Sequence, residues 1–248
     1  MNFLLIIWIN SRSNLYCGQC AQTIFSAKEF ADKQAKIERK EKFSAEYQSI
    51  IEEGRNKIKK VHAKLPSAEL AFLNDLENDL GFSIPFCPKI GHDSYGFSVF
   101  QNHISALGLN NCDLRDVSPK IKNLKCLRKL VLNNNDLVSI PNAFKHLRSL
   151  RILLLENNNI GNIPPFLGSL AYLKDLNLWG NLVDYIPKHI TSFASLKYLN
   201  LSYNSISNFP DFLFEHKSLR FLYLIGNFIE KLPQRIYKRN HNNLKVIL

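Results

Sequence analysis

The chain has 248 residues, of which 46% are hydrophobic, an ordinary share for a soluble protein. This length allows one elongated domain with an N-terminal appendage. Five cysteines, odd in number and scattered, are too few for the disulfide framework of a secreted domain. Reduced thiols and a cytoplasmic location are therefore expected.

The charge is basic and uneven along the chain. Lys and Arg number 32 against 21 Asp and Glu, a net charge of +11. Residues 94–248 hold 19 basic and 9 acidic side chains, whereas residues 1–93 hold 13 and 12. A basic excess in residues 94–248 favours an acidic protein surface, a nucleic acid or an anionic membrane as partner. The alternative is that the charge only keeps the protein soluble.

Residues 1–27 form a short leader. Phe3–Ile9 is apolar but too short for a membrane span, which needs roughly 20 residues. It is either a minimal signal segment or the product of a mis-assigned start. Cys17 and Cys20 have the spacing of half a zinc site, but no second pair follows, and the βαβ context of a redox pair is missing. Plain thiols are the preferred interpretation, and no metal or cofactor is expected.

Residues 28–65 predict a charged amphipathic helix. Its apolar side chains recur at a seven-residue step, at Phe30, Ile37, Ile51, Ile58 and Leu65. One apolar column is thin support for a coiled coil, so a surface helix or a linker is the preferred interpretation.

Residues 66–93 predict a second helix followed by a linker. The helix covers 67–80, with Ser67 as its N-cap and Gly81 as its stop. One face of this helix is apolar and carries Leu70, Leu73, Leu76 and Leu80.

Residues 94–248 form the last predicted domain, and a β-hairpin at 95–109 opens it. Tyr95–Phe100 alternates in polarity, Gln101 and Asn102 are turn residues, and Ile104–Leu109 resumes as a strand. Terminal repeats need a cap, so the first strand of this hairpin is expected to cover the exposed edge of the repeats that follow.

One line, LxxLxLxxNxL, then occurs six times at a constant 23-residue step. Its leading residues are Ile104, Leu127, Leu150, Leu173, Leu196 and Leu219. The alternation in LxL predicts a short strand with inward leucines. A single repeat cannot bury its apolar face, so neighbouring repeats stack, with parallel strands about 4.8 Å apart.

Two further columns recur with the repeat. The first holds Cys112, Asn135, Asn158, Asn181, Asn204 and Asn227. Amides stacked behind the strands are expected to bond loop backbone groups, so the column is interpreted as structural. The second holds Pro141, Pro164, Pro187, Pro210 and Pro233. Proline cannot donate, so extended or 3₁₀ return segments are expected rather than long helices.

This pattern resembles the leucine-rich repeat family, specifically its short, 23-residue, Ile-Pro-containing intracellular type. The resemblance covers Ile104–Ile236 and implies an α/β solenoid, with a curved parallel sheet on the concave face and turns or 3₁₀ segments on the convex face. There are departures from the family pattern. The first repeat has its proline one position late, at Pro119, and His216 stands at an apolar position. An insertion at 237–243 lengthens the last step by two, so that it ends at Leu244.

Strand residues that do not point inward are expected to line the concave face and bind a partner. They are Lys129, Val131, Ile152, Leu154, Glu156, Asp175, Asn177, Trp179, Tyr198, Asn200, Tyr203, Phe221, Tyr223 and Ile225. Aromatics gather towards the C-terminal repeats, as in the centre of a protein interface. The alternatives are that they stabilise the sheet as cross-strand pairs or cover an edge meant for further repeats.

A basic ladder follows the leading leucines, with members Arg128, Arg151, Lys174, Lys197, Arg220 and Lys245. Stacked like charges repel, so an acidic partner would gain by neutralising them. A solvated ladder with splayed side chains is the preferred alternative.

No enzyme motif appears: GxxxxGK[ST], GxGxxG, HExxH and GxSxG are all absent. We therefore predict a non-enzymatic adaptor or scaffold in intracellular signalling that binds a protein, such as one with an acidic surface, on its concave face. One alternative is the recognition part of a larger GTPase, kinase or ligase. Another is nucleic-acid binding through the basic ladder, although no such motif appears and Glu156 and Asp175 place acids on the same face.

Overall fold

A computed structural model describes residues 56–234 and 244–248 of the chain. The chain divides into two compact units, Met1–Leu109 and Asn110–Leu248. The predicted leader, the CxxC pair and most of the first predicted helix lie outside the described residues. Within the described ranges, no helix is long and apolar enough to cross a membrane.

The first unit contains a helical segment at 56–62 and helix α3, Ser67–Leu80. Two of the four leucines predicted for its apolar face, Leu73 and Leu76, are buried together with Phe72. The other two are half-buried. The predicted extent of this helix is confirmed.

The sequence predicted the C-terminal end of α3 correctly but not its N-cap. The N-cap predicted at Ser67 is wrong, because Pro66 holds the cap position. Its carbonyl accepts from the N–H groups of Glu69 and Leu70 at 3.0 Å. Proline suits a helix start, since no N–H partner is needed there. Gly81 ends the helix as predicted, with a left-handed φ of 77°.

A β-hairpin completes the described part of the first unit. Strands β1, Tyr95–Phe100, and β2, His103–Leu109, pair antiparallel. Gln101 and Asn102 have φ of 51° and 62°, the two positive values of a type I′ turn. The predicted hairpin is therefore confirmed, and β1 pairs along one edge of β2, the strand of the first repeat.

A buried carboxylate joins α3 to this hairpin. Glu69 is 3% exposed, and its carboxylate accepts from the N–H of Ile104 at 2.7 Å. Its second oxygen lies 2.8 Å from Nδ1 of His103. The spacing of apolar residues along the helix does not reveal a buried acid, so this contact was not predicted from the sequence.

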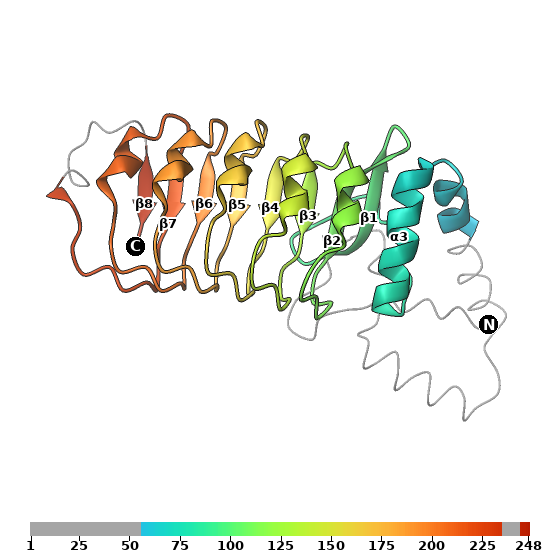
Figure 1. Cartoon of the computed structure of the whole chain (residues 1–248), viewed down its shortest axis with the longest axis horizontal. Helices are drawn as coiled ribbons and strands as arrows, with labels where there is room; N and C mark the ends of the chain where they lie inside the picture. The colour runs from blue at the N-terminus through green and yellow to red at the C-terminus, as the bar shows by residue number, and fades with distance from the viewer. Residues whose placement is uncertain (1–55, 235–243) are drawn as a thin grey trace, which may run out of the picture. The chain divides into compact units, whose positions relative to one another are not determined.

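Parallel strands of three residues form the sheet of the second unit (Figure 1). They are β3 Lys129–Val131, β4 Ile152–Leu154, β5 Asp175–Asn177, β6 Tyr198–Asn200, β7 Phe221–Tyr223 and β8 Lys245–Ile247. Pairing from β3 to β7 keeps one register, in which each residue pairs with the equivalent residue of the next repeat. The middle leucine of each of these strands is fully buried.

Short 3₁₀ helices return the chain over the inner face of the strands (Figure 1). They are η2 Pro119–Asn123, η3 Asn142–His146, η4 Pro165–Ser169, η5 Lys188–Ser192 and η6 Asp211–Glu215. Pro119 stands at the first position of η2, and members of the proline column cap the other four. The predicted 3₁₀ return segments are confirmed.

One asparagine amide per repeat bonds the repeat before it. Asn158 Oδ1 accepts from the N–H of Leu137 at 3.0 Å. Its Nδ2 donates to the carbonyls of Leu132, Leu155 and Glu156 at 2.9 to 3.1 Å. Asn181, Asn204 and Asn227 each accept from and donate to the repeat before them in the same way. Asn135 Oδ1 accepts from the N–H groups of Cys112 and Leu114, and its Nδ2 donates to the carbonyl of Leu132. The column is structural, as predicted, because its amides satisfy backbone groups that have no ladder partner.

His216 replaces a backbone acceptor in the fifth repeat, which Leu196 opens. Earlier repeats bond the N–H of the leading leucine to a carbonyl three residues back, for example Leu196 to Phe193 at 3.1 Å. At Leu219 the acceptor is instead Nδ1 of His216, at 3.2 Å, and Nδ1 lies 3.4 Å from the N–H of Ser218. The polar residue at this apolar position is thus a buried, neutral acceptor.

Strand β8 pairs in a register that differs from the prediction. Lys245 pairs with Phe221 and Val246 with Leu222, one position away from the predicted alignment on Leu244. Lys245 therefore belongs to the face column of Phe221, and its place in the basic ladder was wrong. The alignment to a leucine was misleading because Val246 takes the inward position. Nζ of Lys245 lies 5.7 Å from the centroid of the Phe221 ring, within the range of a cation–π contact.

Replacing Asn158 with alanine should destabilise the second unit strongly. The change leaves the N–H of Leu137 without its side-chain acceptor, and a buried group of this kind costs about 1–3 kcal/mol. The carbonyl of Leu132 loses one of two amide donors and keeps Asn135 Nδ2 at 3.0 Å. We expect a loss of about 2 kcal/mol in the free energy of unfolding, measured by urea denaturation. Asn159→Ala, at the exposed next position, is the control and should cost under about 0.5 kcal/mol. Equal losses in the two variants would contradict the role of the amide.

His216 should make stability fall in mild acid. Burial lowers its pKa below 6.5, and the carbonyl of Ile190 opposes part of that shift. The unfolded chain binds the proton first, so this contribution is complete above pH 6.5 and is lost as the pH falls towards the folded-state pKa. His216→Leu should flatten the pH dependence of the melting temperature between about pH 5 and 6.5. Burial also lowers the pKa of His62, so some slope should remain in the variant. Superimposable curves for the two proteins would refute the assignment.

Candidate functional site

The outer face of the second unit's strands carries columns of side chains in line with one another. Parallel pairing in one register aligns Lys129, Ile152, Asp175, Tyr198 and Phe221. It also aligns Val131, Leu154, Asn177, Asn200 and Tyr223. Glu156, Trp179 and Ile225 follow the strands, and Tyr203 comes one residue later. Neighbouring members of each column lie one strand apart.

Two residues predicted to bind a partner are not accessible. Val131 is 0% exposed and Leu154 is 5% exposed. The prediction for them was wrong because alternation along a strand reports which way a side chain points, not whether its surroundings leave it in contact with water. The other predicted residues are half-buried or exposed.

Aromatic rings gather on β6 and β7 and on the turns beside them. Tyr198 and Phe221, a register pair, stack with centroids 5.0 Å apart and ring planes within 3°. Tyr223 stacks on Phe221 at 6.5 Å. Trp179 and Tyr203 form a second group, with centroids 5.1 Å apart. We call these five residues the aromatic surface.

Tyr203 occupies a backbone position that the other repeats give to asparagine or glycine. The column reads Asn111, Asn134, Asn157, Gly180, Tyr203 and Gly226, with φ between 51° and 69° throughout. Each N–H from Asn111 to Tyr203 donates to a carbonyl of the next repeat, which fixes the left-handed turn. A bulky residue there carries strain of about 1–2 kcal/mol, whereas asparagine and glycine tolerate it.

Strain at Tyr203 coincides with exposure and with space for its ring. The residue is 54% exposed. A Cβ added at Gly226 would lie 2.9 Å from Cδ1 of Tyr203, so glycine there leaves room for the ring. The ring is thus held at the surface, against Trp179, at a position where the backbone disfavours it. Retained strain of this kind clusters at functional sites.

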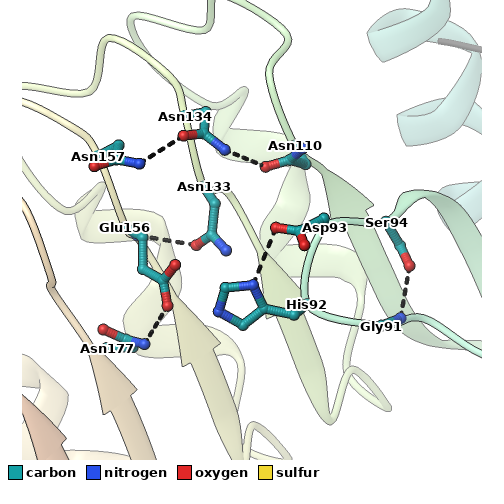
Figure 2. Close-up of polar contacts among 10 residues, drawn as sticks. All are labelled: Gly91, His92, Asp93, Ser94, Asn110, Asn133, Asn134, Glu156, Asn157 and Asn177. Atoms are coloured by element: carbon teal, nitrogen blue, oxygen red, sulfur yellow. Dashed lines mark hydrogen bonds and ion pairs between the residues drawn. The ribbon is translucent and has the colours of Figure 1, made fainter. Parts of the chain in front are cut away.

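The N-terminal part of the same face is polar rather than aromatic. Figure 2 shows Asn157 donating to Asn134, and Asn134 donating to Asn110, at 2.7 and 2.8 Å. This amide chain ends at Gly180, which has no side chain to continue it. The character of the surface therefore changes at β5.

Two of the residues predicted to bind a partner also hold the turns. Asn177 Oδ1 accepts from the N–H of Trp179 at 3.0 Å, and its amide donates to Glu156 (Figure 2). Asn200 Oδ1 accepts from the N–H of Ser202 at 3.0 Å. These amides fix the backbone that carries the aromatic surface, so their role is to position it.

No three His, Cys, Asp or Glu side chains within residues 56–234 and 244–248 are placed to hold a metal ion. Burial, and secondarily the charge of Asp113, raise the pKa of Cys112 to about 12. A thiol with such a pKa is a poor nucleophile near neutral pH.

The left-handed column was missed in the sequence analysis, although a signal for it existed. Asparagine and glycine recurring once per repeat at one offset predict positive φ. Tyrosine at the fifth place of that column departs from the pattern. Tyr203 was predicted to bind a partner only because it is aromatic, and no role was predicted for Gly226.

Comparisons with known proteins agree on the kind of repeat. Residues 102–160 and 171–229 match the family described as Leucine rich repeat. A solved leucine-rich repeat protein of Leptospira interrogans is 31% identical with a TM-score of 0.53, over 57% of this chain and 36% of that one. The leucine-rich repeat ectodomain of the receptor kinase SOBIR1 from Arabidopsis thaliana is 27% identical with a TM-score of 0.52, over 66% and 96%. A search of curated proteins finds no match.

Glycine should stabilise position 203 more than alanine does. Both substitutions delete the ring, but only alanine keeps the left-handed penalty. We expect Tyr203→Gly to exceed Tyr203→Ala by about 1 kcal/mol in the free energy of unfolding. At the exposed Ser205, outside this column, alanine should equal or exceed glycine. If alanine equalled or exceeded glycine at position 203 as well, Tyr203 would not be strained.

Proposed function

Because this chain belongs to the leucine-rich repeat family, whose repeat domains are generally protein–protein interaction modules, we propose that it captures a partner protein on its aromatic surface. In this proposal the chain is an adaptor or scaffold in signalling. Repeat domains of this family are typically non-enzymatic, so the proposed action is binding alone.

Tyr203 is the observation that carries the proposal. Its ring stands in a strained conformation, 54% exposed, beside Trp179. A role in stabilising the sheet alone gives no reason to keep tyrosine at a position whose left-handed φ disfavours it. Packing against a partner gives a reason to retain it.

The composition of the surface also supports a protein partner. Trp and Tyr are enriched among the residues that contribute most to protein interfaces. Among the rings, Tyr198 is 42% exposed, and Ile225, 39% exposed, adds apolar area beside them. Stacked neighbours hold the rings in place before binding, which lowers the entropy lost on association.

A cytoplasmic location is part of the proposal. Cys112 and Cys126 are free thiols among the described residues. Free thiols of this kind are typical of a reducing compartment. Fractionation of cells that produce the tagged protein tests this part.

The test is capture of a partner by immobilised protein, with nuclease-treated lysate and high-salt washing. Trp179→Ala combined with Tyr223→Ala should keep the fold, shown by circular dichroism, and lose most of the captured protein. Removing two anchor residues of an interface commonly costs several kcal/mol. The matched control is Leu182→Ala with Tyr185→Ala, two exposed apolar residues outside the aromatic surface.

A photo-cross-linking amino acid at position 203 locates the contact. It should form an adduct with the captured protein, and the same group at position 185 should not. Undiminished capture by the Trp179/Tyr223 variant would contradict the proposal. Adducts formed only from position 185 would contradict it as well.

A further inference from the structure

Almost all the net charge of the second unit lies along the side at which its strands begin, which we call the basic edge. This basic edge consists of residues 122–128, 145–151, 168–174, 191–197 and 214–220, which run from the end of each 3₁₀ helix to the start of the next strand. It contains ten Lys and Arg residues, and its one acid is Glu215. The rest of residues 110–248 holds nine basic and eight acidic side chains. The edge therefore carries +9 of the unit's +10.

Main-chain hydrogen bonds hold five of these cations in a file. The file is Arg128, Arg151, Lys174, Lys197 and Arg220. From the second member onward, each N–H donates to the carbonyl of the member before it at 2.8 or 2.9 Å. Their spacing is thus fixed at one strand, about 4.8 Å, and the file is about 19 Å long. This regularity is a property of the backbone, not of flexible side chains.

A second set of cations flanks the N-terminal part of the file. Desolvation lowers the pKa of His146, and the charges of Lys125, Lys145, Lys122 and Arg148 lower it further. These cations therefore act together on one point of the surface. Like charges this close repel one another in the free protein, and a polyanion along the edge would relieve that repulsion.

One exposed aromatic residue belongs to the basic edge. Tyr172 is 57% exposed and lies two residues before Lys174. The equivalent positions of the neighbouring repeats are Ser149 and Ser195, whose hydroxyls donate to main-chain carbonyls. Tyr172 is thus a ring beside a file of cations, the combination by which single-stranded nucleic acids are held.

We propose that the basic edge binds the phosphodiester backbone of a single-stranded nucleic acid, with the file on the phosphates and Tyr172 stacking on a base. A protein partner fits this edge poorly, because protein interfaces are depleted in lysine and centred on apolar anchors. A membrane fits poorly because the cations follow a line, and Tyr172 is the one large apolar residue on the edge that is highly exposed. The acids Glu156 and Asp175 belong to the strand columns and fall outside the edge, although Asp175 directly follows Lys174.

The probe is a fluorescein-labelled 20-nucleotide oligouridine, titrated with the whole protein by anisotropy between 50 and 300 mM salt. A single strand loses affinity with a log–log slope of about −0.7 for each phosphate neutralised. Five engaged file residues therefore predict a slope of about −3.5.

Two variants of equal net charge locate the site. Arg151→Ser, Lys174→Ser and Lys197→Ser together should weaken binding at least tenfold and reduce the steepness of the slope by about 2. Arg115→Ser, Lys188→Ser and Lys231→Ser together remove three exposed cations from outside the edge and should leave the slope unchanged. Thermal melts establish that both variants fold.

Tyr172→Ser gives this position the residue found in the neighbouring repeats. It should weaken binding about fivefold or more at an unchanged salt slope, because stacking and phosphate contacts are separate terms. The Trp179/Tyr223 variant should bind the oligonucleotide normally, so this result is independent of the proposed protein partner.

Three results would overturn the proposal. The first is an equal loss in the two triple variants, which would assign binding to net charge alone. The second is equal affinity for polyglutamate, which would assign the edge to acidic proteins. The third is capture by phosphatidylserine vesicles, lost with the file, without binding of oligouridine; this would assign the edge to a membrane.

Discussion

One asparagine amide per repeat holds neighbouring repeats of the second unit in a fixed relation. Asn181 accepts from Ile160 of the repeat before it and donates to the carbonyl of Leu155 in that same repeat. These backbone groups have no other ladder partner, so the amide fixes the distance and the register together. The constant repeat length follows from this bond, and the straight columns of side chains follow from the constant length.

Straight columns explain why the surface divides into separate regions. Equivalent positions of neighbouring repeats are aligned by the backbone. Side chains of one kind at the same position of successive repeats therefore form a row, whether they are amides, rings or cations. The amide row runs from Asn110 to Asn157, and aromatic residues follow from Trp179 onward. Cations occupy a different offset, before each strand, and therefore reach the edge. The rings and the cations can change without loss of the fold because the buried asparagine column and the main chain already bond neighbouring repeats to one another.

The sequence predicted most of this arrangement because periodic signals average over many repeats. The strands, the 3₁₀ segments, the asparagine column and the hairpin each rest on repeated or paired features, and all are confirmed. Predictions that rested on one residue did less well. The N-cap is Pro66 rather than Ser67. Both residue types suit a helix start, so the sequence did not distinguish between them. Lys245 was placed one column off because a leucine was assumed to lead its repeat. Val131 and Leu154 show that orientation does not determine burial.

Tyr203 shows where sequence periodicity and function diverge. The column demands positive φ, and the other repeats comply with asparagine or glycine. Neighbours accommodate the exception: Gly226 leaves room for the ring, and Asn177 fixes the turn that carries Trp179. Strain, space and support therefore meet at one exposed residue. A position that breaks the rule of its column while its surroundings adapt to it is better evidence for a binding role than the aromatic residue alone, since rings also occur where they only stabilise a sheet.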